Sequence, residues 1–232
     1  MKKIIITLSA ICFIAFTSKA QGLFLGVQGG LNNVWISNAN AAWSAIDTID
    51  PSSHKISSVN NTFRGGIGFQ IGYEFNRNVA VVTEFNGQFQ GYKYQDSTIS
   101  KGLLACEYSS SYIQIPLLLK LMTGRDGSGF FAMLGPSYSM LQSASLSETD
   151  PNKMKISTDL FSKNLIKKQD INLTTIIGIQ FKAANHMMFS FGFRGNFGLA
   201  SINNKTSSLR NYTIPKTKNG SIGINLGVGY HF

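Results

Sequence analysis

The sequence predicts an all-β fold, an eight-stranded antiparallel transmembrane β-barrel with up-and-down meander order. Three observations predict it. Apolar residues alternate with polar or small ones in eight segments, as side chains of half-buried strands do. Short and long connections between these segments alternate strictly. After residue 21 no apolar run is long enough to cross a membrane as a helix.

The clearest alternation lies between residues 63 and 75. One face carries Phe63, Gly65, Ile67, Phe69, Ile71, Tyr73 and Phe75. The other carries Arg64, Gly66, Gly68, Gln70, Gly72 and Glu74. Since successive side chains of a strand point to opposite faces, this segment separates two environments. The other seven expected strands span residues 23–31, 79–92, 112–121, 130–142, 171–182, 187–198 and 221–232.

The connections predict an orientation. Three are short, at residues 76–78, 122–129 and 183–186. Four are long and polar, at residues 32–62, 93–111, 143–170 and 199–220. Because membrane barrels have short periplasmic turns and longer outer loops, we expect both termini in the periplasm.

Alternation alone does not say which face points outward. A soluble barrel would place its apolar face inside. The opposite face here consists largely of Gly, Ser, Asn and Gln, and aromatic residues gather toward the strand ends. The chain also ends on an aromatic residue, Phe232. These features favour an apolar face in contact with lipid, flanked by aromatic girdles.

The first twenty residues have the layout of a cleavable signal peptide. Lys2 and Lys3 precede an apolar stretch at residues 4–16, and Ser18-Lys19-Ala20 offers small residues before Gln21. A retained helical anchor is the alternative, but the apolar stretch is too short to span a bilayer. We therefore expect residues 1–20 to be removed and residues 21–232 to form a barrel in the outer membrane of a Gram-negative bacterium.

Composition excludes several functions. Removal of residues 1–20 lowers the net charge from +10 to +7, and the longest basic run is Lys167-Lys168, so no nucleic-acid partner is expected. Cys106 alone remains of the cysteines, which excludes an internal disulfide. Neither metal-ligand spacing nor a catalytic motif surrounds His54, His186 or His231. We expect no enzymatic activity, no cofactor and no metal.

An inward polar face would place six charged residues in the lumen: Arg64, Glu74, Glu84, Lys120, Lys182 and Arg194. Isolated charges inside a narrow barrel are costly, so these side chains should pair with one another. We expect Glu84 to be the hub, with Lys120 and Arg194 as partners. Solvation by water alone is the alternative.

Several segments carry a family resemblance. Residues 112–120, Tyr-Ile-Gln-Ile-Pro-Leu-Leu-Leu-Lys, resemble a characteristic strand of the PorT-like outer-membrane β-barrel family. Residues 131–136 resemble the Gly-Pro strand that follows it, and residues 194–199 the end of its seventh strand. The end of the chain, with Tyr230 and Phe232, is similar to the terminal aromatic signal that the barrel-assembly machinery reads.

The resemblance implies an eight-stranded barrel in contact with outer-membrane lipid, and its namesake takes part in type IX protein secretion. No catalytic motif comes with it. We expect a structural or interaction barrel that binds an envelope protein through its outer loops, as a secretion accessory or in a related role. Residues 35–62, with Trp35, Trp43 and Ile46, form the longest candidate loop. A small pore or a carrier of lipid or small molecules is the alternative.

Overall fold

The computed structural model describes residues 22–37, 56–96, 104–124, 127–149, 155–159, 167–183, 186–202 and 218–232. The expected signal peptide lies outside the described residues, as do Trp43, Ile46 and His54. Over the described part of the chain, no helix is long and apolar enough to cross a membrane.

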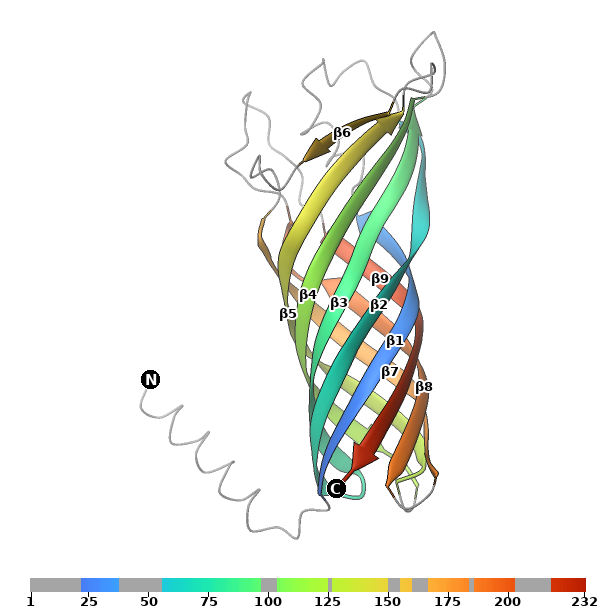
Figure 1. Ribbon diagram of the computed structural model, residues 1–232, viewed down its shortest axis with the longest axis vertical. Helices are drawn as coiled ribbons and strands as arrows, with labels where there is room; N and C mark the ends of the chain where they lie inside the picture. Colours follow the sequence, from blue (N-terminus) through green and yellow to red (C-terminus); the bar gives the residue numbers. More distant parts are fainter. Residues whose placement is uncertain are drawn as a thin grey trace, which may run out of the picture.

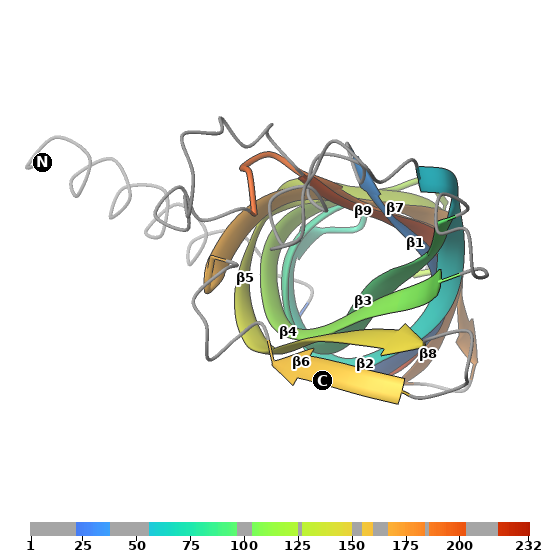
Figure 2. The same ribbon diagram turned by 90° about the horizontal axis from the view of Figure 1, so that it is seen from above.

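All eight expected strands are present and form a closed antiparallel barrel. Their bounds are β1 Gly22–Ser37, β2 Ile56–Asn76, β3 Val79–Asp96, β4 Leu104–Met122, β5 Gly129–Thr149, β7 Gln169–Ala183, β8 Met187–Gly198 and β9 Lys218–His231. Each pairs with its neighbour in sequence order, and β9 pairs with β1 to close the barrel. Figure 1 shows the tilted strands from the side, and Figure 2 shows the closed ring from above. A short strand, β6 Lys155–Asp159, pairs with the end of β5.

The polar face points inward and the apolar face outward. Adjacent residues of β4 illustrate this, since the side chain of Leu117 is 56% exposed whereas that of Leu118 is fully buried. Exposed Phe, Leu, Ile and Val side chains cover the outside of the strands, and Gln, Asn, Ser and Thr fill buried inward positions. The soluble-barrel alternative, with its apolar face inside, is therefore wrong.

The short connections and the C-terminus share one end of the barrel, which we call the turn end; the opposite end is the loop end. The turn between β2 and β3 is stabilised by Asn76, whose Oδ1 accepts hydrogen bonds from the backbone N–H groups of Asn78 and Val79. The β4–β5 turn uses Gly124 and Gly127 at φ angles of 122° and 76°, which side-chain-bearing residues rarely adopt.

The strands differ in length, which the sequence did not predict. Strands β2 to β5 have 18 to 21 residues, whereas β1 and β7 to β9 have 12 to 16. We call β2 to β5 the tall wall. All four long connections are thus strand in part. Trp35 lies within β1 and Glu107 within β4, rather than in loops. On β4 and β5 the outward residues of the extension are mostly serine, namely Ser109, Ser111, Ser143, Ser145 and Ser147. Apolar alternation is lost in these segments, so the sequence predicts strands that end before the observed strands do at the loop end.

Candidate functional site in the barrel lumen

Inward side chains fill the lumen at three levels, which we call the middle level, the turn-end plug and the loop-end level. The middle level is centred on an ion pair between β3 and β8. Arg194 Nη1 lies 2.7 Å from Glu84 Oε2, and both side chains are buried. Asn86 Nδ2 donates to the same carboxylate oxygen at 2.8 Å, and Gln28 Nε2 donates to Asn86 Oδ1 at 2.9 Å.

Amides and hydroxyls extend this network around the lumen. Asn196 Oδ1 accepts hydrogen bonds from Thr174 Oγ1 at 2.8 Å and from Gln114 Nε2 at 3.4 Å. Asn196 Nδ2 donates to Ser221 Oγ at 3.1 Å, and Gln88 Nε2 donates to the same hydroxyl at 3.5 Å. Side chains of strands on opposite sides of the barrel are therefore connected directly across its interior.

The turn-end plug is apolar, although its side chains occupy inward positions. Its buried residues are Phe24, Ala80, Val82, Leu118, Met122, Phe131, Met133, Ile176 and Met188. The ammonium group of Lys120 lies 5.2 Å from the ring centroid of Phe24 and 5.4 Å from that of Phe131. It also donates a hydrogen bond to Gln180 Oε1. Cation–π contacts and this amide oxygen thus stabilise a charge inside an apolar cluster.

Lys120 does not pair with Glu84, contrary to the expected hub arrangement. The reason is its height in the barrel, since Lys120 pairs in register with Ala80, four residues closer to the turn end than Glu84. Its ammonium group binds Gln180 and the two rings instead.

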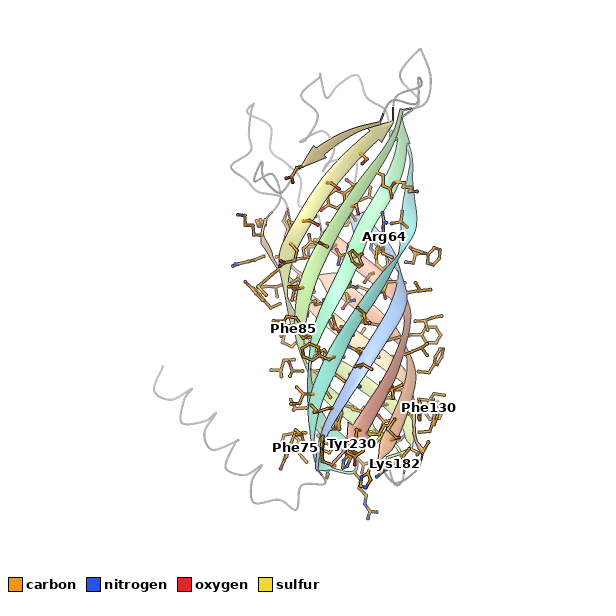
Figure 3. All side chains as sticks on the ribbon, in the orientation of Figure 1. Arg64, Phe75, Phe85, Phe130, Lys182 and Tyr230 are labelled. Carbon is orange, nitrogen blue, oxygen red and sulfur yellow. The ribbon has the colours of Figure 1, made fainter. Side chains whose placement is uncertain are left out.

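The other expected lumen charges lie at the two ends. Glu74 Oε2 lies 3.1 Å from His231 Nε2, which links β2 to the last strand. Lys182 is exposed at the turn end (Figure 3), so it lies outside the buried network, contrary to its predicted place in the lumen. Arg64, labelled near the loop end in Figure 3, is only partly buried, and its Nη2 lies 2.7 Å from Glu107 Oε1 on β4. A Cβ on Gly91 of β3 would lie 3.2 Å from that Nη2. Glycine therefore leaves room for Arg64 to cross β3. Gly91 and Glu107 alternate with the buried Tyr92 and Tyr108 and so face outward, which makes the predicted lumen position of the Arg64 guanidinium wrong.

The loop-end level holds a buried carboxyl group that the sequence analysis missed. Asn219 Nδ2 donates to Asp170 Oδ2 at 3.4 Å and to Tyr112 Oη at 3.3 Å. The sequence pattern places Asp170 in an expected long connection, one residue before an expected strand. Asn172 and Thr174 both face inward, and Asp170 lies two residues before Asn172. The period of two therefore predicts that Asp170 faces inward as well.

The expected assembly signal lies on the outer surface at the turn end. Tyr230 and Phe232 are 44% and 63% exposed, and their ring centroids are 5.0 Å apart. The backbone N–H of Phe232 donates to Leu23 O at 2.9 Å, which holds the end of the chain against β1. Recognition of these rings by the assembly machinery stays a prediction. Among the described residues, no three His, Cys, Asp or Glu side chains are grouped to hold a metal ion.

A closed barrel whose lumen holds a buried polar network and whose outer surface is apolar defines a membrane β-barrel. Residues 18–204 match the family described as outer membrane protein beta-barrel domain. The match spans most of the chain, so the protein belongs to this family and is an outer-membrane β-barrel protein. The finer resemblance to the PorT-like branch stays a prediction. No curated protein matches the chain.

Several solved structures are similar to this chain. OprG from Pseudomonas aeruginosa is 15% identical, with 93% of this chain and 98% of that chain covered and a TM-score of 0.46. Ail from Yersinia pestis, solved with the heparin analogue sucrose octasulfate, is 13% identical over 91% and 99%, with a TM-score of 0.41. Neisserial surface protein A is 11% identical over 93% and 100%, with a TM-score of 0.40. At such identities we carry none of their activities over to this chain.

Proposed function

We propose that this protein is a non-enzymatic, non-conducting barrel that acts as an interaction scaffold through its loop end. The observation that carries the proposal is the turn-end plug. Nine buried apolar residues and Lys120 occupy the lumen beside the short turns. An eight-stranded barrel has an interior that side chains can fill, and such packing disfavours a path for ions.

The orientation is part of the proposal. The short turns and the C-terminus lie at one end of the barrel, and the long connections leave from the other. Because outer-membrane barrels keep short turns on the periplasmic side, this arrangement supports periplasmic termini and an external loop end.

The tall wall supports a role in interaction. Its serine-rich outer surface extends past the apolar band, and long connections leave from the same end. Loops on a rigid scaffold are frequent binding elements. We propose an envelope protein as the partner, and the PorT-like resemblance makes a type IX secretion component the first class to examine.

Planar-bilayer recording tests the closed lumen. The full mature barrel should give no conductance steps above leak, whereas a general porin reconstituted in the same bilayer should give them. Reproducible steps from the barrel would overturn the proposal in favour of a narrow pore.

Loop deletion tests the interaction role. Removing residues 40–54 leaves β1 and β2 intact, so the barrel should stay heat-modifiable on gels. Proteins cross-linked to the wild-type barrel in outer membranes should be lost from this variant. A deletion of residues 204–214, in another long connection, serves as the control. If the set of cross-linked proteins is unchanged by both deletions, the loops do not carry the interaction.

A further inference from the structure

The seam of the barrel, where β1 pairs with β9, differs from the other strand pairs that meet at the turn end. Short turns join β2 to β3, β4 to β5 and β7 to β8 there. No turn joins β1 to β9, because they are the first and last strands that the structure describes. They pair through their backbones, from Phe24 opposite His231 to Ser37 opposite Lys218. Segments at the ends of a domain fray unless they are tied down, so this end of the seam needs another means of closure.

His231 spans the seam with its side chain. It faces inward at the end of β9, and its Nε2 lies 3.1 Å from Glu74 Oε2 on β2. Strand β1 lies between these two strands. The two side chains are only 12% and 9% exposed, so water competes little for the contact. Because a carboxylate only accepts hydrogen bonds, His231 Nε2 carries the proton and donates it. One side chain thus connects the last strand to the second strand across the first.

Gly22 of β1 leaves room for the imidazole to cross. It pairs in register with Glu74, so it lies between the two partners. A Cβ on Gly22 would lie 2.8 Å from His231 Cε1 and 2.7 Å from Phe232 O, closer than real Cβ atoms approach. The φ angle of Gly22 is 134°, which side-chain-bearing residues rarely adopt. Both the space around this glycine and its conformation therefore match the crossing of His231 over β1.

Neighbouring contacts hold the end of β9 in position for this crossing. The backbone N–H of His231 donates to His186 O at 2.9 Å, and His186 Nδ1 donates to His231 O at the same distance. His186 lies in the β7–β8 turn, and its ring stacks on that of Tyr230 with centroids 5.3 Å apart. On the other side, the N–H of Phe232 donates to Leu23 O. The end of β9 is thus fixed to a turn on one side and to β1 on the other.

We propose that His231 and Glu74 form a clasp that takes the place of a turn at this end of the seam and keeps β1 and β9 paired there. Loss of the clasp should open the seam locally, because the backbone pairing of β1 with β9 continues to the loop end. The strand pairs that short turns join should stay closed. The inference does not depend on the proposed scaffold role, since the seam is the same whether or not the loop end binds a partner.

Glu74 has a second basic neighbour, whose effect must be separated from that of His231. Lys120 lines the same small hollow at the turn end as Glu74. A substitution of Glu74 alone therefore also changes the surroundings of Lys120. A double-mutant cycle between Glu74 and His231 separates the two effects, because both single variants lose the clasp but only one of them affects Lys120.

Amide hydrogen exchange of the barrel in lipid nanodiscs measures opening of the seam. In His231→Ala and in Glu74→Ala, amides of residues 23–27 and 226–231 should exchange about tenfold faster, as expected for loss of one hydrogen bond to a charged group. The double variant should exchange no faster than the faster single variant. Amides of residues 218–222, at the loop end of the same seam, should be unchanged. Unchanged exchange at the turn end in both single variants would overturn the proposal, as would multiplying effects in the double variant or equal acceleration over the whole barrel.

Arg64→Ala is the matched control. The Arg64–Glu107 ion pair also crosses a strand beside a glycine, but it lies away from the seam. Its loss should leave exchange at residues 23–27 unchanged, and acceleration there equal to that of His231→Ala would overturn the proposal.

A second measurement serves if His231→Ala fails to assemble. Glu74→Ala leaves the last strand unaltered, and the Nε2–H proton of His231 is then the readout. Proton NMR should detect this proton, protected from exchange with water, in the wild-type barrel and not in Glu74→Ala. Equal protection in both barrels would overturn the proposal, because the proton would then not depend on Glu74.

Discussion

The middle level and the turn-end plug lie in one lumen and on the same strands, yet they are opposite in chemistry. On β3, Val82 belongs to the plug and Glu84, two residues further on, belongs to the ion pair. On β4, Leu118 and Gln114 differ in the same way. The period of two therefore determines which side chains face inward. It does not determine which inward side chains gather into a polar level and which into an apolar one.

The two regions are also stabilised differently. At the middle level each buried polar group depends on directional partners, so loss of one member leaves another unpaired. In the plug, stabilisation comes from close packing, which depends on volume rather than on direction. Lys120 is the exception, because a charge in the plug is stabilised by two aromatic rings and an amide oxygen.

The largest effect should come from the ion pair. Glu84→Ala leaves the buried guanidinium of Arg194 without its carboxylate and should lower the free energy of unfolding by roughly 3–5 kcal/mol. Urea unfolding of the lipid-reconstituted barrel, followed by heat-modifiability, measures it. Glu107→Ala is the control, because Glu107 is about one-third exposed and its loss should cost at most about 1 kcal/mol. Equal effects would contradict the assignment of Glu84 to a buried network.

The next effect should come from the plug. Leu118→Ala removes a fully buried side chain and leaves a cavity, at a cost of roughly 2–5 kcal/mol in the free energy of unfolding. The adjacent Leu117 faces outward, so Leu117→Ala should cost less in the same urea titration. If Leu117→Ala were the more destabilising of the two, the plug would not be packed as described.

The middle level and the turn-end plug also differ in how far the sequence predicts their residues' partners. Strand order, the inward face and the positions of Glu84 and Arg194 follow from alternation, because a one-residue shift would reverse every side chain. The position of Lys120 does not follow, because its height depends on the stagger between strands. The extension of the tall wall was missed where Ser109 and Ser143 replace apolar outward residues. A register shift between β4 and β5 also breaks the period there, since Leu141 and Ala144, three residues apart, are both buried.

The smallest loss of unfolding free energy should come from substituting Arg64, which lies outside the lumen network. Its guanidinium is partly exposed and contacts Glu107 on the tall wall, so Arg64→Gln should lower the free energy of unfolding by about 1 kcal/mol or less. High salt should reduce the difference, because exposed ion pairs are screened. Lys93→Gln is the control, since Lys93 Nζ is 3.9 Å from Glu107 Oε2 and its side chain is 58% exposed, which predicts a still smaller change. A salt-independent loss as large as that of Glu84→Ala would instead place Arg64 with the buried charges of the middle level.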